Sequence, residues 1–144
     1  MKTIKFIYLI TFTLFFTSLS YSQVENHTII SGKTTIAKFY LQRELESMKK
    51  GQLIDLYVER SNALAYSIHL IGLASNPTVR MKDLGIIENS DIIKQLETKH
   101  NEEANFVAKI SNFEKTFLPY VDKIELVSSI LFYEDILKRL QNKD

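Results

Sequence analysis

Glu97 and His100 are three residues apart, a spacing that can place two metal ligands on one face of a helix. Carboxylate oxygens and imidazole nitrogens both bind transition-metal ions. A di-iron bundle uses two such Glu–His pairs and two further glutamates. This sequence offers one pair, since His69 has no carboxylate at the matching spacing. We therefore expect no di-iron centre and no resident cofactor, and keep as an alternative a single divalent-cation site drawn from His69, Glu97, His100 and Glu103.

A heptad pattern of apolar residues between positions 90 and 117 is interrupted for about one turn. Its apolar positions are Ile92, Leu96, Phe106, Ile110, Phe113 and Phe117. Lys99 and Glu103 occupy the heptad positions in the interruption, and His100 lies next to them. Ser61 interrupts an apolar pattern in the preceding part of the chain. The polar residues that flank it are Glu59, Asn62, Tyr66 and His69.

Three interpretations of these two interruptions stay open. If they face each other, they form a polar layer inside a helical bundle, and its charges must then be paired. The same layer could instead line a functional pocket for a ligand. A seam rotated by one position would leave Lys99 and Glu103 in water. We prefer this last interpretation because it buries no charge.

The other reactive side chains fit no catalytic pattern. Gly32 begins a Gly-Lys-Thr sequence, but a phosphate-binding loop needs another glycine five residues earlier, where this chain has His27. Glu134 and Asp135 are adjacent, so their carboxylates diverge on a helix, and we expect the pair on the outer face of the last helix. The chain has no Gly-x-Ser-x-Gly motif and no cysteine nucleophile. We therefore expect that it is not an enzyme.

Long helices are expected to position these residues. The chain has four glycines and two prolines, so few residues interrupt helices. Apolar residues recur every three or four positions in four segments. We predict helices over residues 34–49, 52–75, 90–117 and 120–140, and a short helix over 77–84. The expected boundary residues are Lys49-Lys50-Gly51, Asn76-Pro77, Gly85, either Asn89 or Ser90, and Pro119.

The predicted fold class is all-α. Short connections place neighbouring helices antiparallel, which predicts an up-down four-helix bundle with an extra short helix near residues 77–84. Residues 33–144 are expected to form this bundle as a single domain, since no repeat or low-complexity stretch divides them.

Residues 1–22 have the three-part layout of a secretory signal peptide. The chain starts with the basic Met1-Lys2-Thr3-Ile4-Lys5, continues with an apolar run over 6–19, and then has the small residues of Ser20-Tyr21-Ser22. We predict cleavage before Gln23, export to the periplasm or the outside of the cell, and a flexible leader over 23–32. The alternative is an uncleaved N-terminal membrane anchor, although the run is shorter than the roughly 20 residues that span a bilayer.

The chain is nearly neutral, with 18 basic and 17 acidic residues, which gives no electrostatic basis for binding nucleic acid or an anionic membrane. The absence of cysteine excludes disulfides and thiolate metal sites. We expect an exported, non-enzymatic helical module that binds another envelope or extracellular protein and is not stably inserted in a membrane after cleavage. The alternative function is a metal- or small-ligand-binding bundle that uses the mid-bundle polar cluster. The sequence leaves the oligomeric state open.

Overall fold

The computed structural model describes residues 27–32, 34–70, 72–73 and 78–141, and this part of the chain is all-α, as predicted. Within it, Thr28 and Arg80 form an isolated antiparallel bridge, and no strand is present. The helices are α2 (Gln42–Ser47), α3 (Lys50–Ser67), α4 (Ser90–Phe117) and α5 (Lys123–Gln141), with the 3-10 helices η2 (Met81–Leu84) and η3 (Leu118–Tyr120).

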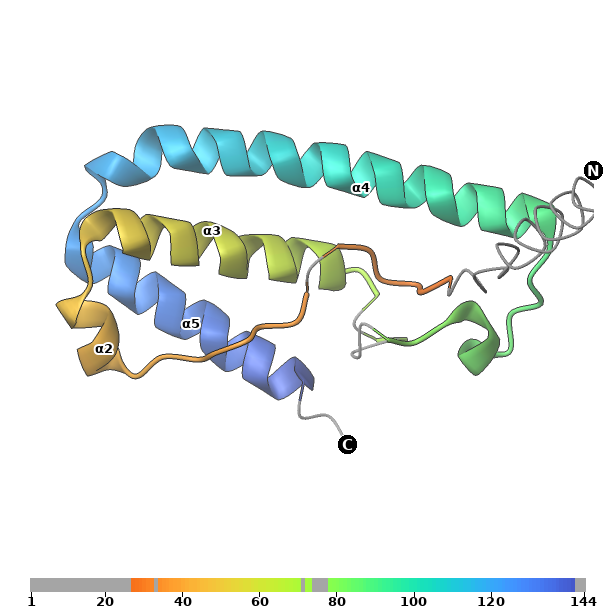
Figure 1. Ribbon diagram of the computed structural model, residues 1–144, viewed down its shortest axis with the longest axis horizontal. Coiled ribbons are helices and arrows are strands. Elements are labelled where there is room, and N and C mark those ends of the chain that lie inside the picture. Colours follow the sequence, from red (N-terminus) through yellow and green to blue (C-terminus); the bar gives the residue numbers. More distant parts are fainter. Residues whose placement is uncertain (1–26, 33, 71, 74–77, 142–144) are drawn as a thin grey trace, which may run out of the picture.

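The three long helices are arranged around α3. Figure 1 shows α4 on one side of α3 and α5 on the other, with the chain direction of α4 opposite to that of both. Helix α3 contacts both neighbours, and the short α2 packs against α5. None of the helices in the described part of the chain is long and apolar enough to cross a membrane.

The prediction of a long first helix over residues 34–49 is wrong. Residues 34–41 are not helical, and the helix α2 that follows spans six residues. Two side chains from other helices hold backbone groups of this segment: Arg60 donates to the carbonyl of Lys38, and Glu134 accepts from the amide of Tyr40. These bonds compete with helix formation, and the β-branched residues at 34–36 favour an extended backbone. The expected up-down four-helix bundle needed this helix as its fourth member.

The predicted break near Lys49-Lys50-Gly51 is present, since α2 ends at Ser47 and α3 begins at Lys50, but the prediction that Gly51 caps it is wrong. Met48 and Lys49 have extended backbone conformations, and Gly51 lies in the first turn of α3. Helix α3 ends at Ser67, earlier than the expected residue 75, and the proposed Asn76-Pro77 boundary lies outside the described residues. The short helix is the 3-10 turn η2, and Gly85 closes it with a φ of 74°, as expected for a left-handed cap.

The leader prediction is wrong for its described part, residues 27–32. Ile29 and Ile30 are buried, and the segment pairs with the chain before η2. The amide of Ile29 donates to the carbonyl of Val79 over 3.0 Å, and the amide of Met81 donates to the carbonyl of His27 over 3.3 Å. The free energy gained by burying two isoleucine side chains outweighs the conformational entropy that the segment loses when it is fixed. The proposed signal peptide over 1–22 lies outside the described residues.

The boundaries of α4 are confirmed. The side chain of Asn89 accepts hydrogen bonds from the amides of Asp91 and Ile92, and the helix ends at Phe117, just before the η3 turn that contains Pro119. Helix α5 begins at Lys123, three residues later than predicted.

The main hydrophobic core lies where α2, α3, η3 and α5 meet. Its buried members are Leu45, Leu53, Val58, Leu118, Leu126, Val127 and Ile130. A second cluster of Ile36, Ala63 and Leu137 fixes the extended segment before α2 against α3 and α5. Each buried aliphatic side chain contributes about 1.5–3 kcal/mol, so the α3–α5 contact stabilises the fold by apolar burial.

Candidate functional site

A buried ion pair joins α3 to α5. The guanidinium of Arg60 is 1% exposed and the carboxylate of Glu134 is 0% exposed, and their closest contact, from Nη2 to Oε1, is 3.0 Å. The expectation that Glu134 lies on the outer face of its helix is wrong. It sits four residues after Ile130 and three before Leu137, so it shares their buried stripe.

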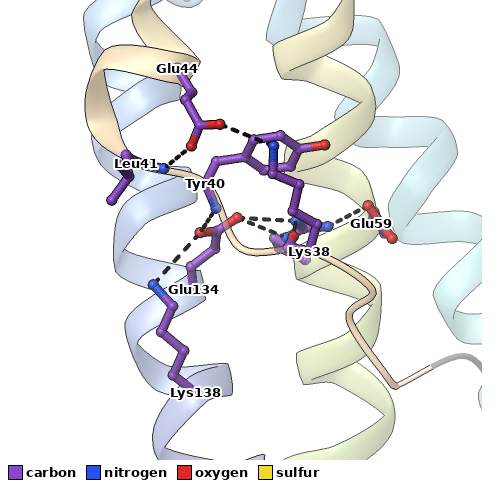
Figure 2. A network of polar contacts seen from close by, with 8 residues as sticks. Lys38, Tyr40, Leu41, Glu44, Glu59, Glu134 and Lys138 are labelled. Atoms are coloured by element: carbon purple, nitrogen blue, oxygen red, sulfur yellow. Dashed lines mark hydrogen bonds and ion pairs between the residues drawn. The ribbon is translucent and has the colours of Figure 1, made fainter.

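The same pair fixes the extended segment before α2. Figure 2 shows the carboxylate of Glu134 between the amide of Tyr40 and the ammonium of Lys138, with Glu59 at the other edge of the network. Nη2 of Arg60 donates to the carbonyl of Lys38 over 2.7 Å, and Nη1 contacts the carboxylate of Glu59. Every charged group of the buried pair is thus occupied by protein contacts, which is the arrangement of a structural clasp. Sequence analysis missed it, although Arg60 follows the buried Leu53 by seven residues and so lies on its stripe.

Polar side chains make the contact between α3 and α4. Ser61 donates to Glu114 over 2.6 Å, and Ser111 donates to Asn62 over 2.8 Å. Further along, His69 contacts Glu103 through its Nε2 nitrogen. The structure therefore brings three of the polar residues singled out on the α3 segment against α4.

Glu103 lies where α4 passes the C-terminal end of α3, and several polar contacts meet at its carboxylate. Its side chain is 12% exposed, so the expectation that it lies in water is wrong. It accepts hydrogen bonds from Lys99 of its own helix and from Ser31 of the N-terminal segment, in addition to the contact with His69. Burial by itself would raise the pKa of this carboxyl, but the bonds from Lys99, His69 and Ser31 outweigh it and hold the pKa of Glu103 below its usual 4.5. Glu103 is therefore a paired anion.

The four candidate metal ligands do not gather around one point. His69 is engaged with Glu103, whereas the Nε2 nitrogen of His100 lies 3.1 Å from the carbonyl oxygen of Ile29. Glu97 is exposed on α4. Within the part of the chain that the structure describes, no group of three or more possible ligands could hold a metal ion.

Glu114 is a buried carboxylate with one unused oxygen. The residue is 7% exposed, and Ser61 donates to Oε1, while Oε2 has no hydrogen-bond partner among the described residues. Burial raises the pKa of Glu114 above 4.5, although the bond from Ser61 opposes the shift. Burial in the middle of the α3–α4 contact therefore makes ionisation of Glu114 less favourable than in water.

A hollow of about 510 Å³ opens beside this contact. Its lining residues are Gly32, Asp55, Val58, Glu59, Asn62, Tyr66 and Val107. The valines are buried, and Asp55 and Glu59 are exposed carboxylates. Gly32 has a φ of 73°, and a Cβ atom there would come within 2.6 Å of the ring of Tyr66, so both the backbone and the packing require glycine.

Helix α4 carries an exposed line of aromatic side chains, which we call the aromatic ridge. It consists of Phe106, Phe113, Phe117 and Tyr120, the last from η3, with exposed fractions of 60%, 68%, 37% and 88%. Within α4, all of whose residues the structure describes, the buried residues are Val107 and Glu114. The aromatic members of the expected seam therefore do not face the bundle, whereas Ile92, Leu96 and Ile110 are partly buried. The side that α4 turns toward α3 holds Val107 and the polar residues Ser111 and Glu114. The heptad pattern predicted these rings on the inward seam of a four-helix bundle, so it did not predict the ridge.

Comparison of the chain with protein-family models, with curated proteins and with solved structures gives no match.

Proposed function

We propose that this chain is an exported helical interaction module that binds a protein partner through the aromatic ridge and catalyses no reaction. The observation that carries the proposal is the exposure of Phe106 and Phe113 on a helix that turns Glu103 and Glu114 inward. The layout of residues 1–22 supports export to the periplasm or the cell exterior.

The chemistry of the ridge supports a protein partner. Aromatic side chains are enriched in the buried centres of protein interfaces, and contiguous exposed apolar patches mark interaction sites. From Phe106 to Phe117 the α-helical part of the ridge is about 17 Å long at the helical rise of 1.5 Å per residue, and Tyr120 of η3 extends it. A partner helix of that length laid along it would complete a four-helix arrangement, with the partner in place of the missing first helix.

Capture from envelope extract tests the proposal. The bait is the chain itself, compared with a Phe106→Ser/Phe113→Ser variant. We expect a protein retained by the wild-type chain and lost with the variant, because truncating two aromatic anchors typically costs several kcal/mol of binding, or about a hundredfold or more in affinity.

The matched control is Phe132→Ser, because Phe132 is 62% exposed on α5, away from the ridge. It should retain the partner. Equal capture by all three baits would contradict the proposed function, and so would the absence of both ridge-dependent capture and ridge-dependent self-association.

The hollow beside the α3–α4 contact favours a second candidate, binding of a small ligand. Three of its lining residues, Glu59, Asn62 and Tyr66, were singled out from the sequence, and buried valines form an apolar surface within it. The carboxylate of Asp55 and the ring of Tyr66 fit a small organic cation, beside the carboxylate of Glu59, which also contacts Arg60.

Calorimetric titration with 1,4-diaminobutane tests this candidate, with the uncharged 1,4-butanediol as the matched compound. Binding of the diamine that falls about tenfold in Asp55→Asn, a change of about 1.4 kcal/mol, would support it. Equal binding of the diol, or none of the diamine, would contradict it. A zinc-dependent rise in Tm would point instead to the metal alternative.

A further inference from the structure

The aromatic ridge has the properties of a surface that pairs with itself. We infer that it docks on the ridge of a second copy of this chain, antiparallel, about a two-fold axis at Phe113. This inference rests on the proposed function of the ridge and names its partner. Three observations carry it: the area of the exposed rings, the position of the midpoint and the scarcity of charge.

The exposed area reaches what a specific dimer needs. An aromatic side chain offers about 150–250 Å². At the exposed fractions of the four ridge residues, each copy presents about 500 Å² of aromatic residue surface, so two copies together bury up to about 1,000 Å² through these residues. That is the lower limit for a biological interface, before any flanking atoms are counted.

The spacing of the rings determines the register. Phe113 lies seven residues from Phe106 and seven from Tyr120, so it is the midpoint of the ridge. A two-fold axis there sets Phe106 of one copy opposite Tyr120 of the other and places the two Phe113 rings together, so that all four aromatic residues of each copy lie within the contact. The rings of Phe113 and Phe117 already pack 5.1 Å apart within one copy, and further rings can add edge-to-face contacts.

Charge does not oppose this pairing. Between residues 105 and 120 the charged residues are Lys109, Glu114 and Lys115. Glu114 is buried toward α3, away from the exposed side of α4. Lys115 follows Phe113 by two residues, so it lies about 200° around the helix, on the side away from the ridge. About the axis at Phe113, the two copies of Lys109 are eight residues apart along the helices, or about 12 Å, which is longer than the Debye length at physiological salt.

Disulfide trapping tests the register, because the chain contains no cysteine. Under mild oxidation, the full-length Phe113→Cys chain should form a covalent dimer, because a disulfide joins Cα atoms about 4.4–6.8 Å apart. Phe106→Cys alone should not, since its two copies would lie about 21 Å apart. A mixture of Phe106→Cys with Tyr120→Cys should give the mixed dimer.

Phe132→Cys is the control for random collision, because Phe132 is as exposed as the ridge but lies on α5. It should remain monomeric under the same oxidation. Trapping of Phe132→Cys or Phe106→Cys as readily as Phe113→Cys would overturn the inference.

Sedimentation of the unmodified full-length chain separates this inference from the proposed function. We expect a dimer for the wild type and for Phe132→Asp, and a monomer for Phe113→Asp, because a charge would enter the contact. Association through residues 1–26 would survive Phe113→Asp and would overturn the inference, as would a wild-type monomer at every concentration. If the wild type is monomeric but still captures another protein through the ridge, the proposed function stands and only the identity of the partner is wrong.

Discussion

Helix α3 contacts α5 on one side and α4 on the other, and the two contacts are made of different side chains. Toward α5, Leu53 and Val58 join a core with Leu126 and Ile130. Toward α4, polar contacts join Ser61, Asn62 and His69 of the α3 segment to Glu114, Ser111 and Glu103. The first contact therefore stabilises the fold by apolar burial, and the second relies on hydrogen bonds, which contribute less each.

The same difference explains the outer surface. When a helix packs its polar side against its neighbour, its apolar side is left exposed. On α4 the exposed apolar side holds Phe106 and Phe113. The α3–α5 half of the molecule is thus a scaffold, and α4 presents the surface through which we propose that the chain interacts.

The largest expected effect is on the scaffold side, at the buried ion pair. Glu134→Leu should lower the free energy of unfolding by about 3–5 kcal/mol, because it leaves the charge of Arg60 buried with its main partner removed. Urea denaturation measures the loss. The Arg60→Met/Glu134→Leu double variant should recover much of it, and a single variant as stable as the wild type would contradict the role of the clasp.

Apolar truncation compares the two contacts directly. Leu126→Ala should cost about 2–5 kcal/mol, because Leu126 is fully buried in the core with α3. Val107→Ala, at the buried apolar position of α4, should cost about 1–2 kcal/mol. The denaturant midpoints of both variants measure these losses of stability. A larger loss for Val107→Ala than for Leu126→Ala would contradict the prediction.

The two carboxylates that α4 turns toward α3 should respond to pH in opposite directions. The pKa of Glu114 is raised in the folded chain, so its ionisation destabilises the fold as pH rises from its unfolded pKa near 4.5 through the folded pKa. Glu114→Gln should therefore be more stable than the wild type near pH 7, because it removes the charge whose burial raises the pKa, and the difference should shrink at acidic pH, where Glu114 is protonated.

Glu103 provides the matched comparison. Its pKa is lowered in the folded chain, so its ionised form stabilises the fold above pH 4.5, and this stabilisation is lost as pH falls through the folded pKa. Glu103→Gln should accordingly be less stable than the wild type near pH 7. Unfolding measured at a series of pH values tests both variants, and the same sign of change in both would contradict the assignment.

The smallest expected effect is on the aromatic ridge. In dilute protein, Phe113→Ser should change the free energy of unfolding by less than about 0.5 kcal/mol, because the ring is 68% exposed. Leu118→Ser, at a position 1% exposed at the end of α4, should unfold the chain far more readily. Thermal denaturation compares them, and similar losses would show that Phe113 belongs to the core.

The sequence predicted the elements whose ends are set by local chemistry. Asn89 caps α4 with its own side chain, and Gly85 closes η2 through its left-handed backbone, so neighbouring residues alone determine both boundaries. The segment over 34–41 was predicted wrongly because Arg60 and Glu134, which hold its backbone, lie far away in the sequence.

The sequence singled out residues that lie at the α3–α4 contact, but the orientation predicted for α4 was wrong. The interruptions at Ser61 and Glu103 do lie where α3 and α4 meet, but α4 has both an apolar and a polar stripe. The periodicity of the sequence cannot decide which of these two stripes faces inward. The apolar stripe was predicted inward because a fourth long helix was expected, and the described fold does not contain that helix. The polar stripe packs against α3 instead, which leaves the aromatic ridge exposed.

Native-state hydrogen exchange tests most directly whether α4 is held by a weaker contact than α5. Amides of α4 (Ser90–Phe117) should exchange through a local opening whose free energy is well below that of global unfolding, while core amides of α3 and α5 exchange only with global unfolding. Equal protection of α4 and α5 at the level of global unfolding would contradict the account.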